Sequence, residues 1–485
     1  MDTISAIATP LGEGGIGVVR ISGPNALRIA DKIFKGKTKP SKAPTHTIHY
    51  GKIIDSDTKI ALDEVLLLVM RKPNTYTREN MIEINAHGGT VGLKQILELT
   101  LKNGARLAEP GEFTKRAFLS GRIDLAQAEA VLDIVQAKTD KSLSLALSHL
   151  NGELSNKIKE IKEKLVKIDA KLEAGIDFPD DVEEHNEVVA INELSLLSKK
   201  IAKLLKSGES GKLVREGATV PIVGRTNVGK SSLFNALISQ NRAIVTPYPG
   251  TTRDTIEGWI NLDGIPIKLV DTAGIRKAKN PIEKQGMQKT QKAIEEAFAI
   301  LFVFDRSEGI LKEDLELLED VKNKWNGRSN LPPRSDGTPI PSEIAKIIGI
   351  LNKRDLNPAP VIWDAELHNS RGDDLSTTPQ LDKLISVSAL RGDNIDSILP
   401  AISELISANN IPPLVMRTRH LDALRRAGMA IERAISLIGV GLKPALPELI
   451  SYEIREAMDS LGEITGEVTS EDILNRIFSE FCIGK

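Results

Sequence analysis

The chain has 485 residues, of which 41% are hydrophobic and 27% are charged, and its formal net charge is -2. This length predicts about three domains, and the near-neutral charge means that any contact with RNA would need a local basic patch. The single cysteine, Cys482, excludes an internal disulfide framework and favours a reducing, cytoplasmic location. No apolar run reaches the ~18 residues of a membrane span, so none is expected.

Residues 1–118 predict a domain of mixed strands and helices. Apolar, β-branched runs at 17–21 and 64–69 are typical of strands and are separated by turns containing glycine and proline. Residues 12–17 match Gly-x-Gly-x-x-Gly, but a dinucleotide site needs a strand before this pattern and a helix after it. Here Pro10 precedes the pattern and a strand follows it, so we reject NAD or FAD binding at this position.

Helical periodicity begins at about Ile123 and returns after about Ile411. One apolar helix face is predicted at Leu154, Ile158, Ile161, Leu165, Ile168 and Leu172, and another at Leu446, Leu449, Ile450, Ile454, Ala457, Met458 and Leu461. We expect residues 119–212 and 409–485 to form one antiparallel helical bundle. The domain at 213–408 would then be inserted into it.

The inserted segment alternates apolar strands with helices. Strands are predicted at 220–223, 265–270, 299–304, 347–351 and 385–387. This alternation predicts a mostly parallel sheet with helices on both faces. Pro221 conflicts with a central position for the first strand, because proline has no backbone N–H to donate.

A phosphate-binding loop is predicted at residues 224–231, which match Gly-x4-Gly-Lys-Ser between a strand and a helix. Backbone N–H groups of such a loop surround phosphate oxygens, and the helix N-terminus adds a favourable dipole. Lys230 would neutralise the β- and γ-phosphates, and the Ser231 hydroxyl would ligate Mg²⁺. The predicted contacts are Asn227, Val228, Gly229, Lys230, Ser231 and Ser232.

Three more motifs follow, each at the end of a predicted strand, where parallel sheets bind ligands. The first is Asp271, Thr272, Ala273 and Gly274, of which the aspartate reaches Mg²⁺ through water and the glycine N–H meets the γ-phosphate. The second contains Asn352, Lys353 and Asp355. The Asp355 carboxylate can accept two N–H groups of guanine, which selects GTP over ATP. The third is Ser388 and Ala389, whose backbone would meet the guanine carbonyl.

The residue after Gly274 is Ile275, where many GTPases have a glutamine that orients the attacking water. An apolar side chain cannot do this. Another group must therefore position the water and offset charge in the transition state.

With these motifs, the chain resembles the MnmE (TrmE) family of tRNA-modification GTPases over essentially its whole length. Separate segments carry the resemblance: 8–10, 14–17, 20–23, 87–89, 110–113, 116–118, 124–130, 250–254 and the terminal Cys-Ile-Gly-Lys. The resemblance implies a multidomain α/β protein. It would combine an N-terminal α+β folate-binding and dimerisation domain, an all-α bundle and an inserted P-loop GTPase domain.

The implied function is modification of carbon 5 of the wobble uridine of certain tRNAs with a carboxymethylaminomethyl or aminomethyl group. The implied partners are a second copy of the chain and an MnmG (GidA)-type FAD protein, together forming a heterotetramer. The implied one-carbon donor is a tetrahydrofolate derivative, either the 5-formyl or the 5,10-methylene form. K⁺ is implied to stimulate GTP hydrolysis.

The resemblance also implies roles for particular residues. The K⁺ ligands would be Asn227, Thr246, Tyr248 and Thr251, Thr252 would ligate Mg²⁺, and Glu283 would orient the attacking water. Tyr248 departs from the small or aliphatic residue expected there, which a backbone carbonyl ligand tolerates. From the residues alone, Glu283 would be interpreted as a solvated helix residue.

Four residues are implied for folate: Arg20, Glu83, Arg122 and Lys485. A carboxylate suits the donors on a pterin edge, and cations suit the glutamate tail. Cys482 is a candidate nucleophile, although a small tail residue is the alternative interpretation. Two other functions stay open: an RNA-binding switch in ribosome assembly or translation, and a GTP-regulated scaffold.

Overall fold

The computed structural model describes residues 2–177, 186–240, 257–272, 290–326, 346–357, 381–406, 414, 416–439 and 447–485. Contacts within the chain define two units. The first comprises Met1–Leu132, Ser148–Leu172 and Ile454–Lys485, and the second comprises Asp133–Leu147 and Glu173–Glu453. The domain boundaries expected at 118, 212 and 408 stay a prediction.

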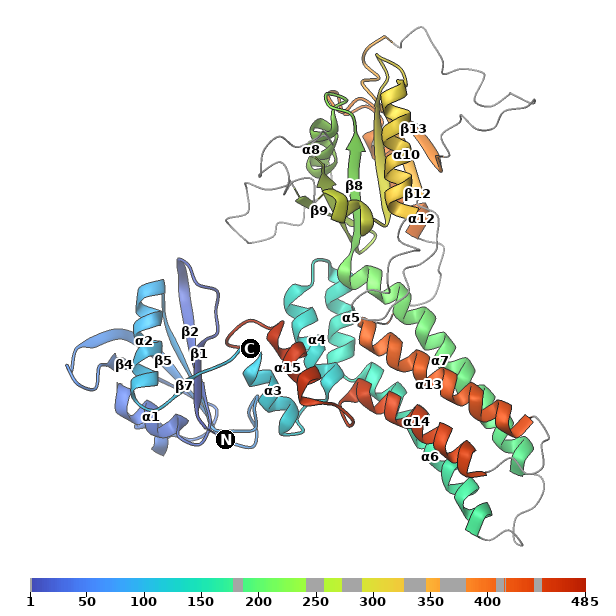
Figure 1. Cartoon of the computed structure of the whole chain (residues 1–485). Coiled ribbons are helices and arrows are strands. Elements are labelled where there is room, and N and C mark those ends of the chain that lie inside the picture. Colours follow the sequence, from blue (N-terminus) through green and yellow to red (C-terminus); the bar gives the residue numbers. More distant parts are fainter. Residues whose placement is uncertain are drawn as a thin grey trace. The chain divides into compact units, whose positions relative to one another are not determined.

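The first unit contains a seven-stranded sheet in the order β3-β4-β5-β6-β2-β1-β7 (Figure 1). Its strands are β1 (Ile4–Ile7), β2 (Gly14–Ser22), β3 (Phe34–Gly36), β4 (Thr47–Ile54), β5 (Ala61–Met70), β6 (Met81–Gly88) and β7 (Arg106–Leu107). Neighbours are antiparallel except β1 and β7. Helices α1 (Ala26–Ile33) and α2 (Thr90–Lys102) bury one sheet face, and the 3₁₀ helix η1 (Pro40–Lys42) follows β3.

The strands predicted at 17–21 and 64–69 are confirmed within β2 and β5. The glycine pattern at 12–17 leads from β1 directly into β2. The strand–turn–strand interpretation is therefore confirmed, and no helix follows the pattern to offer its N-terminus to a dinucleotide.

The helices around this sheet and in the bundle are α3 (Glu112–Leu119), α4 (Leu125–Gln136), α5 (Asp140–Leu150), α6 (Glu153–Asp177), α7 (Asn186–Glu216), α13 (Thr418–Gly439), α14 (Pro447–Thr465) and α15 (Glu471–Ser479). The predicted apolar face of α6 is buried from Leu154 to Ile168. The face predicted on α14 is partly wrong, because Leu449 is 47% exposed while Ile450, Ile454 and Leu461 are buried. Leu446 lies outside the described residues.

Helices from before and after the inserted domain pack together, as predicted. In the second unit α7 lies along α13 (Figure 1). In the first unit, Arg455 of α14 bonds to Asp169 of α6 at 3.3 Å. The buried side chains on these helices are mostly leucine, isoleucine and alanine, as expected for packed helix faces.

The sheet of the inserted domain has the order β13-β12-β11-β8-β10-β9. Its strands are β8 (Ala218–Gly224), β9 (Glu257–Leu262), β10 (Ile265–Asp271), β11 (Ala299–Asp305), β12 (Lys346–Asn352) and β13 (Lys383–Ser386). All neighbours are parallel except β9 and β10. Helices α8 (Lys230–Gln240) and α12 (Ile398–Ile406), which follows the 3₁₀ helix η4 (Ile395–Ser397), pack against one core cluster, and α10 (Lys312–Asn326) packs against another.

The five predicted strands of this sheet are confirmed. Pro221 does lie inside central strand β8, opposite Val270 of β10. The paired register of β8 with β11 begins one residue later, at Ile222. The missing N–H of Pro221 is accommodated in this way.

The two connections of the inserted domain converge on one carboxylate. Arg417, directly before α13, bonds to the Oδ1 atom of Asp133 at 3.0 Å, and Arg215, near the end of α7, lies 3.9 Å from the same atom. The β9–β10 hairpin also contacts the residues that precede α5. The Thr139 hydroxyl donates to the Gly264 carbonyl at 2.7 Å, and the Lys138 ammonium lies 3.0 Å from the centre of the Trp259 ring.

Arg116 is the centre of a buried ion-pair network in the first unit. Its guanidinium bonds to Asp2 at 2.7 Å, to Glu112 at 2.9 Å and to Glu79 at 3.1 Å. A hydrogen bond from Arg106, opposed by partial burial and assisted by Arg116, lowers the pKa of Asp2 to about 2. This network ties the N-terminus and the loop before β6 to α3.

Among the residues that the structure describes, no helix combines the length and the hydrophobicity that crossing a bilayer requires.

We expect Arg116→Ala to lower the free energy of unfolding of the first unit by about 3 kcal/mol, because two largely buried carboxylates lose their shared cation. Urea denaturation followed by circular dichroism would measure this loss. Arg28→Ala removes an exposed arginine of the same unit and serves as the control. Equal stability of the two variants would contradict a structural role for the network.

Candidate functional site

The loop after β8 has the backbone geometry of a phosphate cradle. Asn227 lies in the left-handed region with φ 66°, which asparagine tolerates better than most residues, and Gly229 has φ 94°. A Cβ atom on Gly229 would lie 2.2 Å from the side-chain nitrogen of Asn352. Glycine is therefore required here both by the backbone and by its neighbour. Helix α8 then begins at Lys230, which directs its N-terminus toward the loop.

The Lys230 ammonium is held inside this loop. It is 7% exposed and donates to the carbonyls of Gly224 at 3.0 Å and Arg225 at 2.6 Å. Burial lowers the pKa of Lys230, and the negative charge of Asp271 opposes that shift. A positive charge is thus kept at low exposure beside the backbone of the loop.

Asp271 ends β10 beside the loop, and Thr272 directly follows the strand. The Thr272 hydroxyl donates to the Ile222 carbonyl at 2.6 Å, which fixes the end of β10 to β8. Asp271 is buried, and its Oδ1 atom has no hydrogen-bond partner among the described residues. A buried carboxylate oxygen without a partner is costly unless a cation or water meets it. Together with the hydroxyl of Ser231 at the start of α8, this carboxylate fits a hydrated Mg²⁺.

Asn352 connects the phosphate loop to the base-binding loop. Its side-chain nitrogen donates to the Val228 carbonyl at 2.9 Å, and its side-chain oxygen accepts from the Ala389 N–H at 2.9 Å. The Ser388 hydroxyl donates to Asp355 at 2.6 Å, and this hydrogen bond is the main reason that the pKa of Asp355 is lowered. Asp355 is therefore an ionised acceptor, as recognition of guanine N–H groups requires.

Two supporting residues of this site were missed by the sequence analysis. Asp305, at the end of β11, is 2% exposed and pairs with Lys353 at 2.5 Å. Arg225 of the phosphate loop bonds to buried Asp314 of α10 at 2.7 Å. A carboxylate that directly ends an apolar strand could have indicated Asp305. The partner of Arg225 is 89 residues away and had no local signal.

Several predicted residues lie outside the part of the chain that the structure describes. They are Thr246, Tyr248, Thr251, Thr252, Ala273, Gly274, Ile275 and Glu283. The predicted residues that are described and gathered in one site are Asn227, Val228, Gly229, Lys230, Ser231, Ser232, Asp271, Thr272, Asn352, Lys353, Asp355, Ser388 and Ala389.

A second group of predicted residues lies in the first unit. Arg20 of β2 faces Glu83 of β6 in the sheet, and the two side chains pair at 2.8 Å. The Arg20 guanidinium also donates to the Gly484 carbonyl at 3.1 Å. The last residues of the chain therefore return to this sheet, which places Lys485 in the same region. Arg122 makes a different contact, because its guanidinium lies 4.7 Å from the centre of the Tyr76 ring.

The exposed Cys482 is part of the same returning tail. Its carbonyl accepts from the Lys485 N–H at 3.3 Å and, at 3.5 Å, from Gly111 before α3. These contacts hold the tail backbone in place. They give the thiol itself no activating partner.

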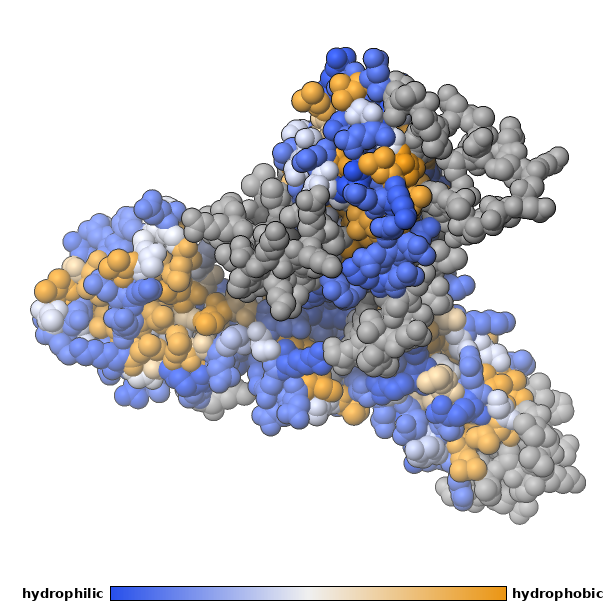
Figure 2. Space-filling model, turned by 45° about the horizontal axis from the view of Figure 1, so that its top comes forward, coloured by the Kyte–Doolittle hydropathy of each residue, from blue (hydrophilic) through white to orange (hydrophobic). Residues whose placement is uncertain are grey.

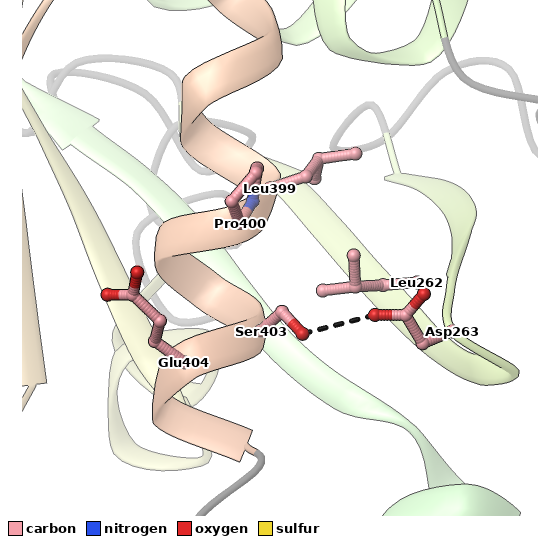
Figure 3. A pocket seen from close by; sticks show the side chains of 6 residues that line it. All are labelled: Leu262, Asp263, Leu399, Pro400, Ser403 and Glu404. Carbon is pink, nitrogen blue, oxygen red and sulfur yellow. Dashed lines mark hydrogen bonds between the residues drawn. The ribbon is translucent and has the colours of Figure 1, made fainter.

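A shallow pocket lies at the other end of the inserted domain (Figure 3). It is lined by Leu262 and Asp263 of the β9–β10 turn and by residues of α12, where the Ser403 hydroxyl donates to Asp263 at 3.1 Å. The turn precedes β10, whereas the nucleotide motifs follow the strands. This pocket is therefore separate from the nucleotide site.

Comparison with known proteins gives two family matches. A model described as the MnmE helical domain matches residues 125–482, and one described as the GTP-binding protein TrmE N-terminus matches residues 3–122. Similar curated proteins include "tRNA modification GTPase MnmE" from Staphylococcus aureus strains bovine RF122 / ET3-1 and Newman. Each is 41% identical over 491 residues, covering 100% of this chain and 100% of the relative.

Solved structures give weaker likenesses. An Era variant from Aquifex aeolicus bound to GDP.AlF4- is 26% identical, covers 44% of this chain and 65% of its own, and has a TM-score of 0.26. The G domain of the T. maritima FeoB iron transporter is 21% identical, covers 39% of this chain and 98% of its own, and has a TM-score of 0.25. Both TM-scores are too low to support a conclusion about this chain.

We expect Asn352→Ala to weaken GDP binding by about 10- to 100-fold, because two loops lose one hydrogen bond each, at roughly 1 kcal/mol per bond. Titration with a fluorescent GDP analogue would measure the change. Asn394→Ala removes an asparagine that bonds to the Ser386 carbonyl and is the control. Unchanged affinity in Asn352→Ala would show that the two loops hold their positions without this side chain.

Proposed function

Because this chain belongs to the MnmE family of tRNA modification GTPases, we propose that it modifies carbon 5 of the wobble uridine of certain tRNAs together with an MnmG-type FAD protein. The chain is a GTP hydrolase of that family. The observation that carries the proposal is the match over 100% of both chains, which includes the N-terminal unit as well as the nucleotide loops. The group added would be carboxymethylaminomethyl or aminomethyl.

The nucleotide chemistry is assigned to residues at the ends of the strands. Lys230 would bind the β- and γ-phosphates, while Ser231 and Thr252 would ligate Mg²⁺, with Asp271 acting through water. Asp355 would select guanine, and Asn352 would keep the phosphate and base loops at a fixed separation. These roles are supported by the burial of Lys230 and Asp271 and by the hydrogen bonds of Asn352.

Hydrolysis needs a further group, because Ile275 cannot orient water. We assign this role to Glu283. Asn227, Thr246, Tyr248 and Thr251 would hold K⁺, which would supply positive charge beside the phosphates, as an arginine does in other GTPases. The exposed position of Asn227 in the phosphate loop supports its part in this assignment.

A tetrahydrofolate derivative, 5-formyl or 5,10-methylene, is proposed as the one-carbon donor in the first unit. Glu83 would accept hydrogen bonds from the pterin edge, and Arg20, Arg122 and Lys485 would attract the glutamate tail. The return of the Gly484 carbonyl to Arg20 supports a shared site for three of these residues. Cys482, in the same tail, stays a candidate nucleophile.

A homodimer is also proposed. The sheet of the first unit is covered by α1 and α2 on one face, while Ile48 and Tyr50 of β4 and Leu66 of β5 are exposed by 62, 66 and 45% on the other. Tyr50 and Leu66 are direct neighbours in the ladder. Figure 2 shows hydrophobic residues gathered on this part of the molecule, at the left of the view. Such an apolar face suits a second copy of the chain.

Two copies of this chain and two MnmG-type chains would form the heterotetramer. It would act in the cytoplasm, where tRNA is found.

The alternative is an RNA-binding switch in ribosome assembly or translation. The N-terminal segments and the terminal Cys-Ile-Gly-Lys favour the modification enzyme, since a switch would not need an Arg20–Glu83 site completed by the tail.

A bacterial strain that lacks its own member of the family tests the proposal. We expect this chain to restore the wobble modification, measured by mass spectrometry of digested tRNA. Glu283→Ala should bind GTP but fail to hydrolyse it and fail to restore the modification. No restoration by the unaltered chain, expressed with its own partner, would contradict the proposed function.

We expect GTP turnover of the purified chain to rise at least about tenfold when K⁺ replaces Na⁺, because Na⁺ is too small for the proposed site. A tenfold rise in rate corresponds to an activation barrier lower by ~1.4 kcal/mol. Release of phosphate at constant ionic strength would measure the rate. Equal turnover in the two salts would remove the K⁺ assignment.

A further inference from the structure

A group of lysines gives the first unit a strong local positive charge. Lys32, Lys35, Lys37, Lys39 and Lys42 follow one another within eleven residues, although the net charge of the chain is -2. Between Glu13 and Asp55 the sequence contains a single carboxylate side chain, that of Asp31.

These lysines lie on neighbouring elements along one edge of the sheet. Lys32 lies in the last turn of α1, which also carries the exposed Arg28, and Lys35 lies on edge strand β3, on the sheet face opposite α1. The backbone N–H of Ser41 in η1 donates to Asp31 of α1 at 2.8 Å, which holds η1 beside α1. The name basic strip is used here for this set of exposed residues: Arg28, Lys32, Lys35, Lys37, Lys39 and Lys42.

The positive charges of the basic strip are not neutralised by ion pairs. Within the described part of the chain, none of its six residues has an ion-pair partner. Lys35 also lies directly opposite Lys52 in the β3–β4 ladder, and like charges at such positions destabilise a sheet. Lys52 pairs with Glu64 at 3.0 Å, which leaves the charge of Lys35 uncompensated.

Protection of a sheet edge explains only part of this pattern. Lysine on an edge strand discourages pairing with other chains, and this would account for Lys35. It does not account for Arg28 and Lys32 on a helix, for Lys39 directly before η1, or for Lys42 within it. A surface of several unpaired cations from three elements is typical of a site that meets a polyanion.

We propose that the basic strip is the surface on which this protein docks the phosphate backbone of its tRNA substrate. The inference rests on the proposed function, which supplies an RNA partner. Contacts to phosphates orient an RNA without reading its bases, and each releases counterions. The strip would hold the body of the tRNA, and sequence selection would occur elsewhere.

The test replaces three of the strip's lysines by glutamine in the full-length chain, as Lys37→Gln, Lys39→Gln and Lys42→Gln together. Binding of unmodified tRNA is measured by fluorescence anisotropy over a series of KCl concentrations. We expect affinity at low salt to fall about tenfold or more, and the slope of log affinity against log salt to fall by about two to three, at roughly 0.7–0.9 per lost phosphate contact. GTP hydrolysis without tRNA should not change.

Two further variants make the result specific. Lys94→Gln, Lys167→Gln and Lys312→Gln together remove the same charge from exposed positions outside the strip and should leave the slope unchanged. Replacing the three strip lysines by arginine should preserve binding. Equal slopes for the strip variant and the control variant would overturn the proposal.

Two other outcomes would overturn it in different ways. If the strip variant loses binding to phosphatidylglycerol vesicles but keeps its affinity for tRNA, the polyanion is a membrane surface. If the unaltered chain, alone or with its flavoprotein partner, binds no tRNA, the proposed function fails first. In that case the wobble modification would also be absent from the complemented strain.

Discussion

The two loops of the candidate nucleotide site are joined by the side chain of one residue, Asn352. In the sheet, β11 separates β8 from β12, so the loops that follow these two strands are not joined by a backbone ladder. The Asn352 amide spans the gap by bonding to Val228 on one side and Ala389 on the other. Gly229 lacks a side chain at the point where this amide lies. The phosphate end and the base end of the site are thereby fixed to each other.

The same constraint explains how much of the site could be predicted from sequence. Each motif directly follows a buried strand, and parallel strands bring their carboxyl ends to one edge. Local patterns therefore placed the five strands, and thirteen described candidate residues lie at the ends of these strands or directly after them. Strand β9 was missed, because its residues alternate between exposed and buried at the edge of the sheet and carry no continuous apolar run.

Contacts between distant residues could not be predicted in this way. Arg116 of α3 forms ion pairs with Asp2 and Glu79, and Arg20 donates a hydrogen bond to the Gly484 carbonyl, 464 residues away. Charged side chains have many potential partners in a chain with 27% charged residues, so only the tertiary fold selects among them. The prediction that Leu449 is buried is wrong for a related reason. A helical pattern predicts an apolar face but not how much of that face a neighbouring helix covers. The near-neutral net charge of the whole chain likewise gives no indication of the basic strip.

The convergence of Arg215 and Arg417 on Asp133 brings together the two connections of the inserted domain. The chain enters the inserted domain after one arginine and leaves it before the other, and both lie against the same carboxylate. Two chain ends that meet at one point can be joined by a short turn without disturbing the helices on either side. Helices α7 and α13 therefore pack along each other although the whole nucleotide-binding domain lies between them in the sequence.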